Sequence, residues 1–251
     1  MKAKAIRYIF LFCLLLTAVQ IKAQNTIFLA EGKIEFEKRV NQYALMEEGD
    51  TWSDLQKKTM PKFKTTYFDL LFSKNKTIYQ PGRENPDNNK MMWGGEGVAQ
   101  ENVVYTELDS ARSISQKKVF ETMFLIQDST RRIQWKITDE TRAIAGFQCR
   151  RANALIMDSI YVVAFYTDDI ITPGGPESFT GLPGMILGVS LPHQHVTWFA
   201  TKVAARPLTA AELKTPTRGK KVTNASLRES LNDVMKDWGK YKQRNLEAVI
   251  L

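Results

Sequence analysis

The two histidines of the chain, in His193-Gln194-His195, are its most direct candidates for chemistry. In an extended strand, residues two apart point to the same side, so both imidazoles could bind one zinc or copper ion. Two histidines alone leave a zinc site incomplete. Candidate third ligands lie in the preceding loop: Asp168, Asp169 and Glu177. Pro192 directly before the pair favours a different interpretation, an exposed polar turn. Both stay open: a metal site made by His193 and His195, or a solvated turn.

Catalytic chemistry finds little support in the remaining polar residues. Asp139-Glu140 and Asp168-Asp169 are paired carboxylates, but each pair is expected at a strand end, and adjacent residues do not face each other across a substrate as glycosidase acids do. The sequence holds no Gly-x-Ser-x-Gly elbow and no His-Glu-x-x-His helix. Cys149 lies in a strand-like run and reads as a small buried apolar residue. We therefore expect no catalytic residues and no cofactor.

A segment rich in glycine and proline, residues 174–189, contains five glycines and two prolines. Glycine opens backbone conformations closed to other residues and proline fixes φ, so the segment predicts a shaped corner before a strand, next to Trp135 and Tyr166. A phosphate-binding loop is disfavoured, because such loops open a helix. The alternative is a binding rim with apolar tips on a rigid scaffold. Its candidate residues are Pro176, Phe179, Gly181, Leu182, Pro183, Gly184 and Met185.

The run Gly-Pro-Glu-Ser-Phe-Thr-Gly-Leu-Pro-Gly-Met-Ile-Leu-Gly-Val within this segment resembles the signature of the GLPGLI family, secreted proteins of Bacteroidetes, with Met185 in place of the usual leucine. The resemblance extends over residues 134–208, through runs at 135–141, 144–152 and 164–170. It implies an exported protein. The biochemical role of the family is not established, and the resemblance implies no catalytic residues.

The N-terminus has the three-part pattern of an export signal. Lys2, Lys4 and Arg7 precede an apolar run, Tyr8–Val19, and Ala23 offers a small residue for cleavage. The apolar run is shorter than the ~20 residues that a membrane-spanning helix needs. We expect residues 1–23 to be cleaved, residues 24–251 to form a single GLPGLI-like β-rich domain, and no transmembrane segment to remain.

The net charge of the chain bears on whether it binds nucleic acid. The whole chain has 35 basic and 27 acidic residues, a net charge of +8. The four basic residues within 1–23 leave 31 basic residues against 27 acidic ones, or +4. This mild charge removes the main support for nucleic-acid binding. The remaining basic cluster, Arg218, Lys220 and Lys221, indicates a solvated loop.

The elements that must position these residues are mainly strands. Residues 31–46 alternate apolar and polar side chains, and residues 65–72 and 76–80 read as a hairpin. Residues 50–62 indicate one helix. Further short strands are expected at residues 103–108, 117–127, 131–138, 144–157, 161–167, 185–191 and 195–203, with turns at Asp139-Glu140 and similar pairs. Without βαβ alternation, a parallel dinucleotide-binding sheet is disfavoured.

The C-terminus changes to helical spacing. Thr209 and Glu212 predict a single turn, and Thr223 or Asn224 can begin a longer amphipathic helix. Its apolar stripe is Leu227, Leu231, Val234, Trp238 and Tyr241. The predicted fold class is α+β and mostly β: an antiparallel meander forming a curved sheet or partly open barrel, with a C-terminal amphipathic helix.

Three functions remain in competition. The first is an exported, non-catalytic cell-envelope protein, in the periplasm, associated with the outer membrane or extracellular, that binds a partner such as an outer-membrane transporter or assembly complex. The second is a carrier of an apolar ligand in a half-open sheet. The residues expected to line that cavity are Phe68, Phe72, Met91, Met92, Trp93, Phe124 and Met157. The third is a metal-binding protein that uses His193 and His195.

Overall fold

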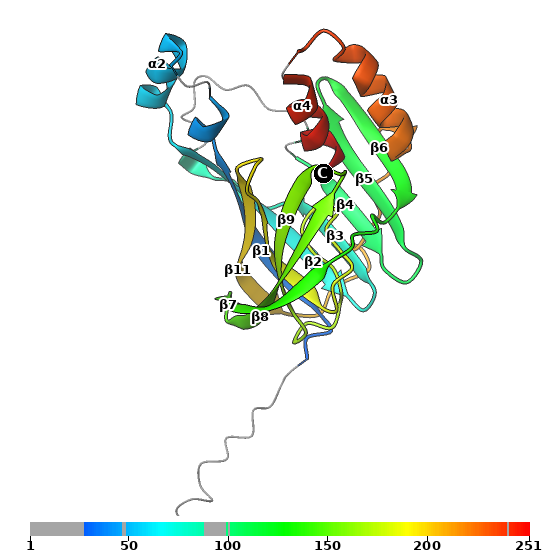
Figure 1. Ribbon diagram of the computed structural model, residues 1–251. Helices are drawn as coiled ribbons and strands as arrows, with labels where there is room; N and C mark the ends of the chain where they lie inside the picture. Colours follow the sequence, from blue (N-terminus) through cyan, green and yellow to red (C-terminus); the bar gives the residue numbers. More distant parts are fainter. Residues whose placement is uncertain (1–27, 47–48, 88–98, 100, 240) are drawn as a thin grey trace, which may run out of the picture.

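Antiparallel strands with alternating apolar and polar side chains build most of the molecule (Figure 1). The structure, a computed structural model, describes residues 28–46, 49–87, 99, 101–239 and 241–251. The strands are β1 (Glu31–Asn41), β2 (Phe63–Ser73), β3 (Lys76–Pro81), β4 (Val103–Glu107), β5 (Arg112–Val119), β6 (Thr122–Ser129), β7 (Lys136–Ile144), β8 (Phe147–Ile156), β9 (Ile160–Thr167), β10 (Met185–Leu191), β11 (Val196–Ala205) and β12 (Lys220–Val222). The expected signal peptide, residues 1–23, lies outside the described residues.

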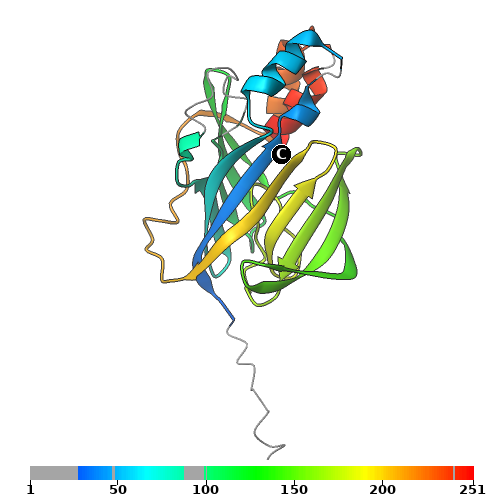
Figure 2. The same cartoon turned by 90° about the vertical axis from the view of Figure 1, so that its left-hand side faces the viewer.

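Within those residues, the twelve strands form one sheet in the order β12-β6-β5-β4-β3-β2-β1-β11-β10-β9-β8-β7. Two meanders, β1 to β6 and β7 to β11, meet where β1 pairs with β11. Neighbours are antiparallel except that β12 runs parallel to β6. Figure 2 shows β1 and β11 running between the two halves of the sheet. The sheet is curved and not closed into a barrel, which confirms the predicted fold class.

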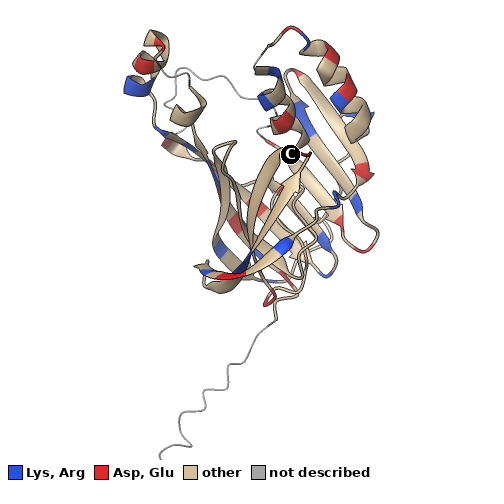
Figure 3. Ribbon diagram, in the orientation of Figure 1, with Lys and Arg blue, Asp and Glu red and all other residues tan. Residues whose placement is uncertain are grey.

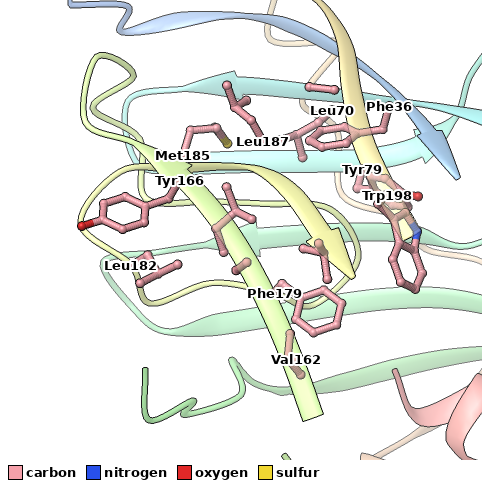
Figure 4. Close-up of a cluster of buried hydrophobic side chains, with 14 of the residues drawn as sticks. Phe36, Leu70, Tyr79, Val162, Tyr166, Phe179, Leu182, Met185, Leu187 and Trp198 are labelled. Carbon is pink, nitrogen blue, oxygen red and sulfur yellow. The ribbon is translucent and has the colours of Figure 1, made fainter. Parts of the chain in front are cut away.

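Irregular pairings accompany the curvature of the sheet. The register shifts between Glu35 and Phe36 where β1 meets β11, between Ile186 and Gly188 where β10 meets β9, and between Ile137 and Thr141 where β7 meets β8. Bulges of this kind bend a strand and increase its local twist. The main core gathers buried side chains from both halves, including Phe36, Leu70, Ile160 and Leu187. Figure 4 shows part of this core.

Three strand predictions were wrong. The strand expected at residues 131–138 begins only at Lys136 and continues to Ile144. Residues 117–127, expected as one strand, belong to β5 and β6, which a turn at Phe120 separates. Phe120 adopts a φ of 54°, and neither glycine, proline nor asparagine marks that turn in the sequence. Asp139-Glu140, expected as a turn, lies inside β7. The carboxylates there belong to an exposed part of the strand.

The described helices fall into two groups, one after β1 and one at the C-terminus. α2 (Thr51–Thr59) and the 3-10 turn η2 (Tyr43–Leu45) follow β1, and α2 projects from the body (Figure 1). α3 (Asn224–Val234) begins with a capping box between Thr223 and Ser226. α4 (Tyr241–Ile250) packs with α3 against β5 and β6. None of the described helices is long and apolar enough to span a membrane.

The single C-terminal helix of the sequence prediction is divided into two. Leu227 and Leu231 are buried as expected, in a small core with Met235, Leu246 and Val249. The helix ends at Val234, however, and Val234, Trp238 and Tyr241 are exposed. The apolar residues at helical spacing therefore extend beyond the end of α3. The chain turns at Met235, whose side chain is buried in the same small core.

Charged residues of both signs are spread over strands and helices in Figure 3. Several form half-buried pairs, such as Lys33 with Asp69 and Arg206 with Glu212, both at 2.6 Å. Lys220 and Lys221 are exposed on β12. This mixture agrees with the mild net charge calculated for residues 24–251.

Candidate functional site

The glycine- and proline-rich segment joins β9 to β10 and is anchored by backbone hydrogen bonds. The amide of Ile186 donates to the carbonyl of Gly174 at 2.8 Å. The indole Nε1 of Trp135 donates to the carbonyl of Thr180 at 2.9 Å. Tyr166 lies opposite Ile186 in the β9–β10 pairing. The segment is thus a shaped corner beside Trp135 and Tyr166, as the sequence predicted.

Two glycines are required by this corner. Gly184 has a φ of 143°, and a Cβ there would collide with the carbonyl oxygen of Thr167. Gly181 has a φ of 94°, a region that L-residues rarely adopt, although a Cβ there would have space beside Trp135. Gly184 is therefore needed for the close approach of the backbone at Thr167. Gly181 is needed only because other residues rarely adopt its φ angle.

The apolar side chains of the segment are not surface tips. Phe179, Leu182 and Met185 are buried in the main core, and Figure 4 shows them among Val162, Tyr166 and Leu187. Pro176 is also buried, whereas Gly181 and Pro183 are exposed. The exposed apolar rim expected from the sequence is therefore wrong for these three side chains, because the segment completes the core. A binding role for the segment itself stays a prediction.

The segment instead carries an acid into the interior. Glu177 is 3% exposed and adopts a φ of 50°, which is uncommon for a residue with a side chain. Its carboxylate accepts a hydrogen bond from Nδ2 of Asn102 at 3.0 Å and lies 3.5 Å from Nζ of Lys38. The Lys38 ammonium also lies 5.0 Å from the centre of the Trp198 ring. A largely buried ion pair with aromatic contacts thus lies behind the corner.

The environment of Tyr79 reflects this buried charge. Burial raises the pKa of Tyr79 well above its ordinary value, and the negative charge of Glu177 raises it further. The nearby indole N–H of Trp198 acts in the opposite direction. Within the described residues, neither Tyr79 Oη nor Trp198 Nε1 has a partner that meets hydrogen-bond geometry. The interior around Glu177 is therefore polar and incompletely paired.

A hollow of about 240 Å³ opens beside this ion pair, and we call it the inner hollow. Strands β1 and β11, the corner and α4 supply most of its walls. Its polar lining includes Lys38, Asn102, Glu177, Gln194, Arg244 and Glu247. Its apolar lining includes Val40, Val196, Trp198, Ala248 and Leu251.

A second, larger opening of about 790 Å³ lies on the other side of the corner, and we call it the basic cleft. Its charged lining consists of four cations and two acids: Lys117, Arg131, Arg132, Arg228, Asp128 and Asp158. Hydroxyl groups of β5, β6 and the corner add hydrogen-bonding capacity: Ser113, Ser115, Ser129, Thr130, Ser178 and Thr180.

Two cations in the lining of the cleft also hold the end of α4. Lys117 is 4% exposed and donates to the carbonyl of Val249 at 2.9 Å. Arg131 donates through Nη2 to the carbonyl of Ile250 at 2.7 Å. Positive groups are favourable at a helix C-terminus, where the carbonyls lack helical partners. In the part of the chain that the structure describes, Arg131 Nη1 is buried without a partner.

Burial perturbs both cations. Desolvation lowers the pKa of Lys117 from 10.5 to about 8, with further lowering by Arg131 and Lys38, while Glu177 opposes the change. Desolvation also lowers the pKa of Arg131. Burial therefore disfavours the charged form of both side chains. An anion bound in the cleft would stabilise that charged form.

The corner and the end of α4 together divide the two openings. Glu177 lines the inner hollow while Ser178 lines the basic cleft, and Leu251 lines the hollow while Ile250 lines the cleft. Ser178 Oγ donates to the carbonyl of Leu251 at 2.7 Å and closes the partition. Neighbouring residues of one segment thus serve two different sites.

The histidine pair lies in the turn between β10 and β11, where residues 192–195 connect the strands. His193 and His195 are exposed, and His195 has a φ of 55°. Between them, Gln194 turns inward, donates to Glu247 at 3.3 Å and lines the inner hollow. Among the described residues, no group of three or more His, Cys, Asp or Glu side chains converges. Metal binding by the pair stays a prediction.

The described residues among those chosen for an apolar cavity are divided between different surroundings. Phe68 and Phe72 belong to the main core, Phe124 packs with the helices, and Met157 lines the basic cleft. Met91, Met92 and Trp93 lie outside the described residues. Cys149 is buried, and burial, followed by the charge of Asp169, raises its pKa to about 12. Its thiol therefore behaves as an inert core group.

Sequence reasoning missed Lys117, Arg131, Asn102 and Gln194, and it considered Glu177 only as a metal ligand. One signal was present for Lys117, which shares the strand face of Ser115 and the buried Val119. Glu177 is the single acid in an otherwise apolar and small-residue segment. No local pattern marked Asn102 or Arg131, because distant segments create their surroundings.

Comparison with known families gives one match. Residues 155–188 match a Porphyromonas gingivalis-type family described as "Protein of unknown function (Porph_ging)". The matched stretch runs from the end of β8 through β9 and the corner to β10. It fits a family of Bacteroidetes proteins, under a name other than GLPGLI. No curated protein matches the chain.

Solved structures show a similar fold. Two structures of PNGF-II, in space groups C2 and P21, align with TM-scores of 0.52 and 0.53 and 14% sequence identity. The alignments cover 79% and 80% of this chain but 32% and 33% of the PNGF-II chains. The chain thus spans about a third of the length of these proteins, and at this identity the likeness concerns the fold alone.

Proposed function

We propose that the protein is an exported binding protein of the cell envelope, without catalytic activity, and that its basic cleft takes up an anionic ligand. One observation carries the proposal. Lys117 and Arg131, two cations held largely out of water, line an opening of about 790 Å³, and Arg131 Nη1 is without a partner among the described residues. Openings of roughly 300–1,000 Å³ are typical of small-ligand sites.

Three further features favour an anion. Four cations against two acids give the cleft a positive lining. Asn224 and Ala225, at the N-terminus of α3, also line it, and helix N-termini attract negative charge. Serine and threonine hydroxyls can donate to carboxylate or phosphate oxygens. A carboxylate- or phosphate-bearing group fits this donor set.

The apolar carrier is the weaker alternative. The aromatic side chains chosen for it that the structure describes are packed in cores, and the larger opening is lined mainly by polar groups. An apolar ligand there would cover charged groups without pairing them, which costs free energy.

The cleft is tested by calorimetric titration with inorganic phosphate and with citrate. We expect saturable binding to the wild type and at least about tenfold weaker binding to Arg131→Gln, since hydrogen bonds to charged groups contribute ~1.5–3 kcal/mol. Arg218→Gln changes an exposed arginine that does not line the cleft and is the matched control. Equal affinities for wild type and Arg131→Gln, with both variants folded, would remove the cleft from the proposal.

Export and family membership belong to the same proposal. The N-terminal pattern and the GLPGLI-like signature support a secreted member of that family, in the periplasm or at the outer membrane. The intact mass of the exported protein should lack residues 1–23, and a mature species that keeps Met1 would contradict export.

We further propose that the anionic ligand is presented by a cell-envelope partner, such as an outer-membrane transporter or assembly complex. Affinity purification from native envelopes should recover this partner with the wild type and Arg218→Gln but not with Arg131→Gln. Equal recovery with all three proteins would separate the partner from the cleft.

A further inference from the structure

We propose that the inner hollow binds a small neutral molecule with several hydroxyl groups, such as a polyol or a single sugar unit. This site is separate from the basic cleft and does not depend on the function proposed for that cleft. The evidence is a set of buried polar atoms on residues that line the hollow, and two of these side chains are oriented by hydrogen bonds to acids of the same lining.

The amide of Asn102 supplies the first unfilled position. Asn102 is 2% exposed, and its Nδ2 donates to Glu177 at 3.0 Å. This bond to a carboxylate fixes which end of the amide is nitrogen, so Oδ1 is an acceptor. Oδ1 is buried and, within the described part of the chain, receives no hydrogen bond. A ligand in the hollow would have to bring a donor to it.

Gln194 repeats the same arrangement from the β10–β11 turn. Its Nε2 donates to Glu247 of α4 at 3.3 Å, which again fixes the amide. Its buried Oε1 has no donor among the residues that the structure describes. Two amide acceptors from distant segments, Asn102 and Gln194, therefore line one hollow and both need donors.

Trp198, which is buried and lines the same hollow, contributes a hydrogen-bond donor instead of an acceptor. Its indole Nε1 can only donate; it lies near the hydroxyl of Tyr79, but among the described residues no acceptor meets hydrogen-bond geometry. A single hydroxyl group both donates and accepts. A ligand with several hydroxyls can thus satisfy the two amides and the indole together, whereas an apolar ligand would leave all three unpaired.

The charge of the lining indicates a neutral ligand. The hollow is lined by two cations, Lys38 and Arg244, and two acids, Glu177 and Glu247. Lys38 and Glu177 already pair with each other at 3.5 Å. An added charge would find no opposite charge in excess, and its loss of hydration would not be compensated.

Size and shape agree with a compact molecule. A volume of about 240 Å³ corresponds to roughly eight water molecules at about 30 Å³ each. Val40, Val196 and Ala248 add aliphatic surface that suits the C–H groups of a polyol. Ordered water can satisfy the same polar atoms, so occupation by water alone is the outcome that the experiment must separate.

The experiment measures binding of sorbitol and of glucose to the full chain by saturation-transfer NMR, followed by a crystal structure with the bound probe. Ala248 is exposed and lines the hollow, so Ala248→Phe should fill the opening without changing the core. Ala210 is exposed outside both openings, and Ala210→Phe is the matched control. We expect saturable signals with the wild type and Ala210→Phe, and their loss with Ala248→Phe.

A second variant tests the donors directly. Gln194→Leu removes one acceptor and should weaken binding about threefold to tenfold, the range for one neutral hydrogen bond. Arg218→Gln changes an exposed arginine that lines neither opening and should leave binding of both probes unchanged. Equal signals for wild type and Ala248→Phe, or a crystal structure with only water in the hollow at saturating probe, would overturn the proposal.

Discussion

Ser178 Oγ donates a hydrogen bond to the carbonyl oxygen of Leu251 at 2.7 Å, and this contact joins the corner between β9 and β10 to the end of α4. Lys117 and Arg131 hold the two preceding carbonyls, those of Val249 and Ile250. Three consecutive carbonyls are therefore bound by side chains from three different segments. The position of α4, and with it the shape of both openings, depends on the corner.

We expect substitutions at the two glycines of the corner to destabilise the protein to different extents. Gly184→Val should lower the free energy of unfolding by ~1–3 kcal/mol or more, because the new side chain meets the Thr167 carbonyl and the φ of 143° is strained. Gly181→Ala should cost only ~1–2 kcal/mol, because its φ of 94° is unfavourable but space is available. Urea unfolding of both variants measures the difference.

If Gly184→Val unfolds at the urea concentration of the wild type but loses its cell-envelope partner, the corner is a recognition element and not a packing element. If Gly181→Ala proves more costly than Gly184→Val, steric contact with Thr167 is not the constraint.

The buried ion pair makes the second prediction. Glu177→Ala should lower the free energy of unfolding by ~3–5 kcal/mol, because it leaves the ammonium of Lys38 buried without its partner. The double variant Lys38→Met/Glu177→Gln removes both charges and should recover much of that loss. Chemical unfolding of the wild type, Lys38→Met, Glu177→Gln and the double variant forms a cycle that measures the coupling. A double variant as unstable as the sum of its single changes would show that the pair is not coupled.

The pH dependence of stability should report Lys117. Burial lowers its pKa from 10.5 to about 8, so between these values the unfolded chain holds a proton that the folded protein has released. The unfolded state then binds more protons, and the free energy of unfolding rises with pH. Each pKa unit corresponds to ~1.4 kcal/mol, so this residue contributes up to ~3 kcal/mol between about pH 8 and pH 10.5.

Lys117→Met isolates this effect, because every other titrating group is kept. Urea unfolding near pH 7 and near pH 10 should show the wild type gaining stability relative to the variant as pH rises. A difference between the two proteins that stays constant with pH would mean that Lys117 does not titrate in this window.

Local patterns predicted β2, β3, β9 and β10 to within two residues of their bounds. β1 ends at Asn41, before its expected end at residue 46, and β9 and β10 are buried on both faces. The division of β5 from β6 was missed because the turn depends on Phe120 at a φ of 54°, a backbone state that its residue type does not indicate. The break after α3 was missed because Met235 is placed by tertiary packing.

The candidate sites were harder to predict, because each is assembled from distant segments. Glu177 and Asn102 are 75 residues apart in sequence, and Lys38 and Glu177 are 139 apart. The pairing of β1 with β11 brings these segments together, and no single segment encodes it. The exposed turn, one of the two interpretations of His193-Gln194-His195, is what the structure shows, and it places Gln194 between them in the lining of the inner hollow.

The metal prediction for His193 and His195 can now be stated in structural terms. Both side chains are exposed on one four-residue turn, and among the described residues no third His, Cys, Asp or Glu side chain completes a cluster with them. Imidazole suits zinc and copper, but two ligands give weak, solvent-open binding. Calorimetric titration of the metal-free protein with zinc and with copper should therefore show weak heats that depend on the pair. The variant His193→Ala/His195→Asn should lose them, since asparagine tolerates the φ of 55° at position 195 and keeps the turn folded. Equal heats for the variant and the wild type would exclude both histidines from metal binding.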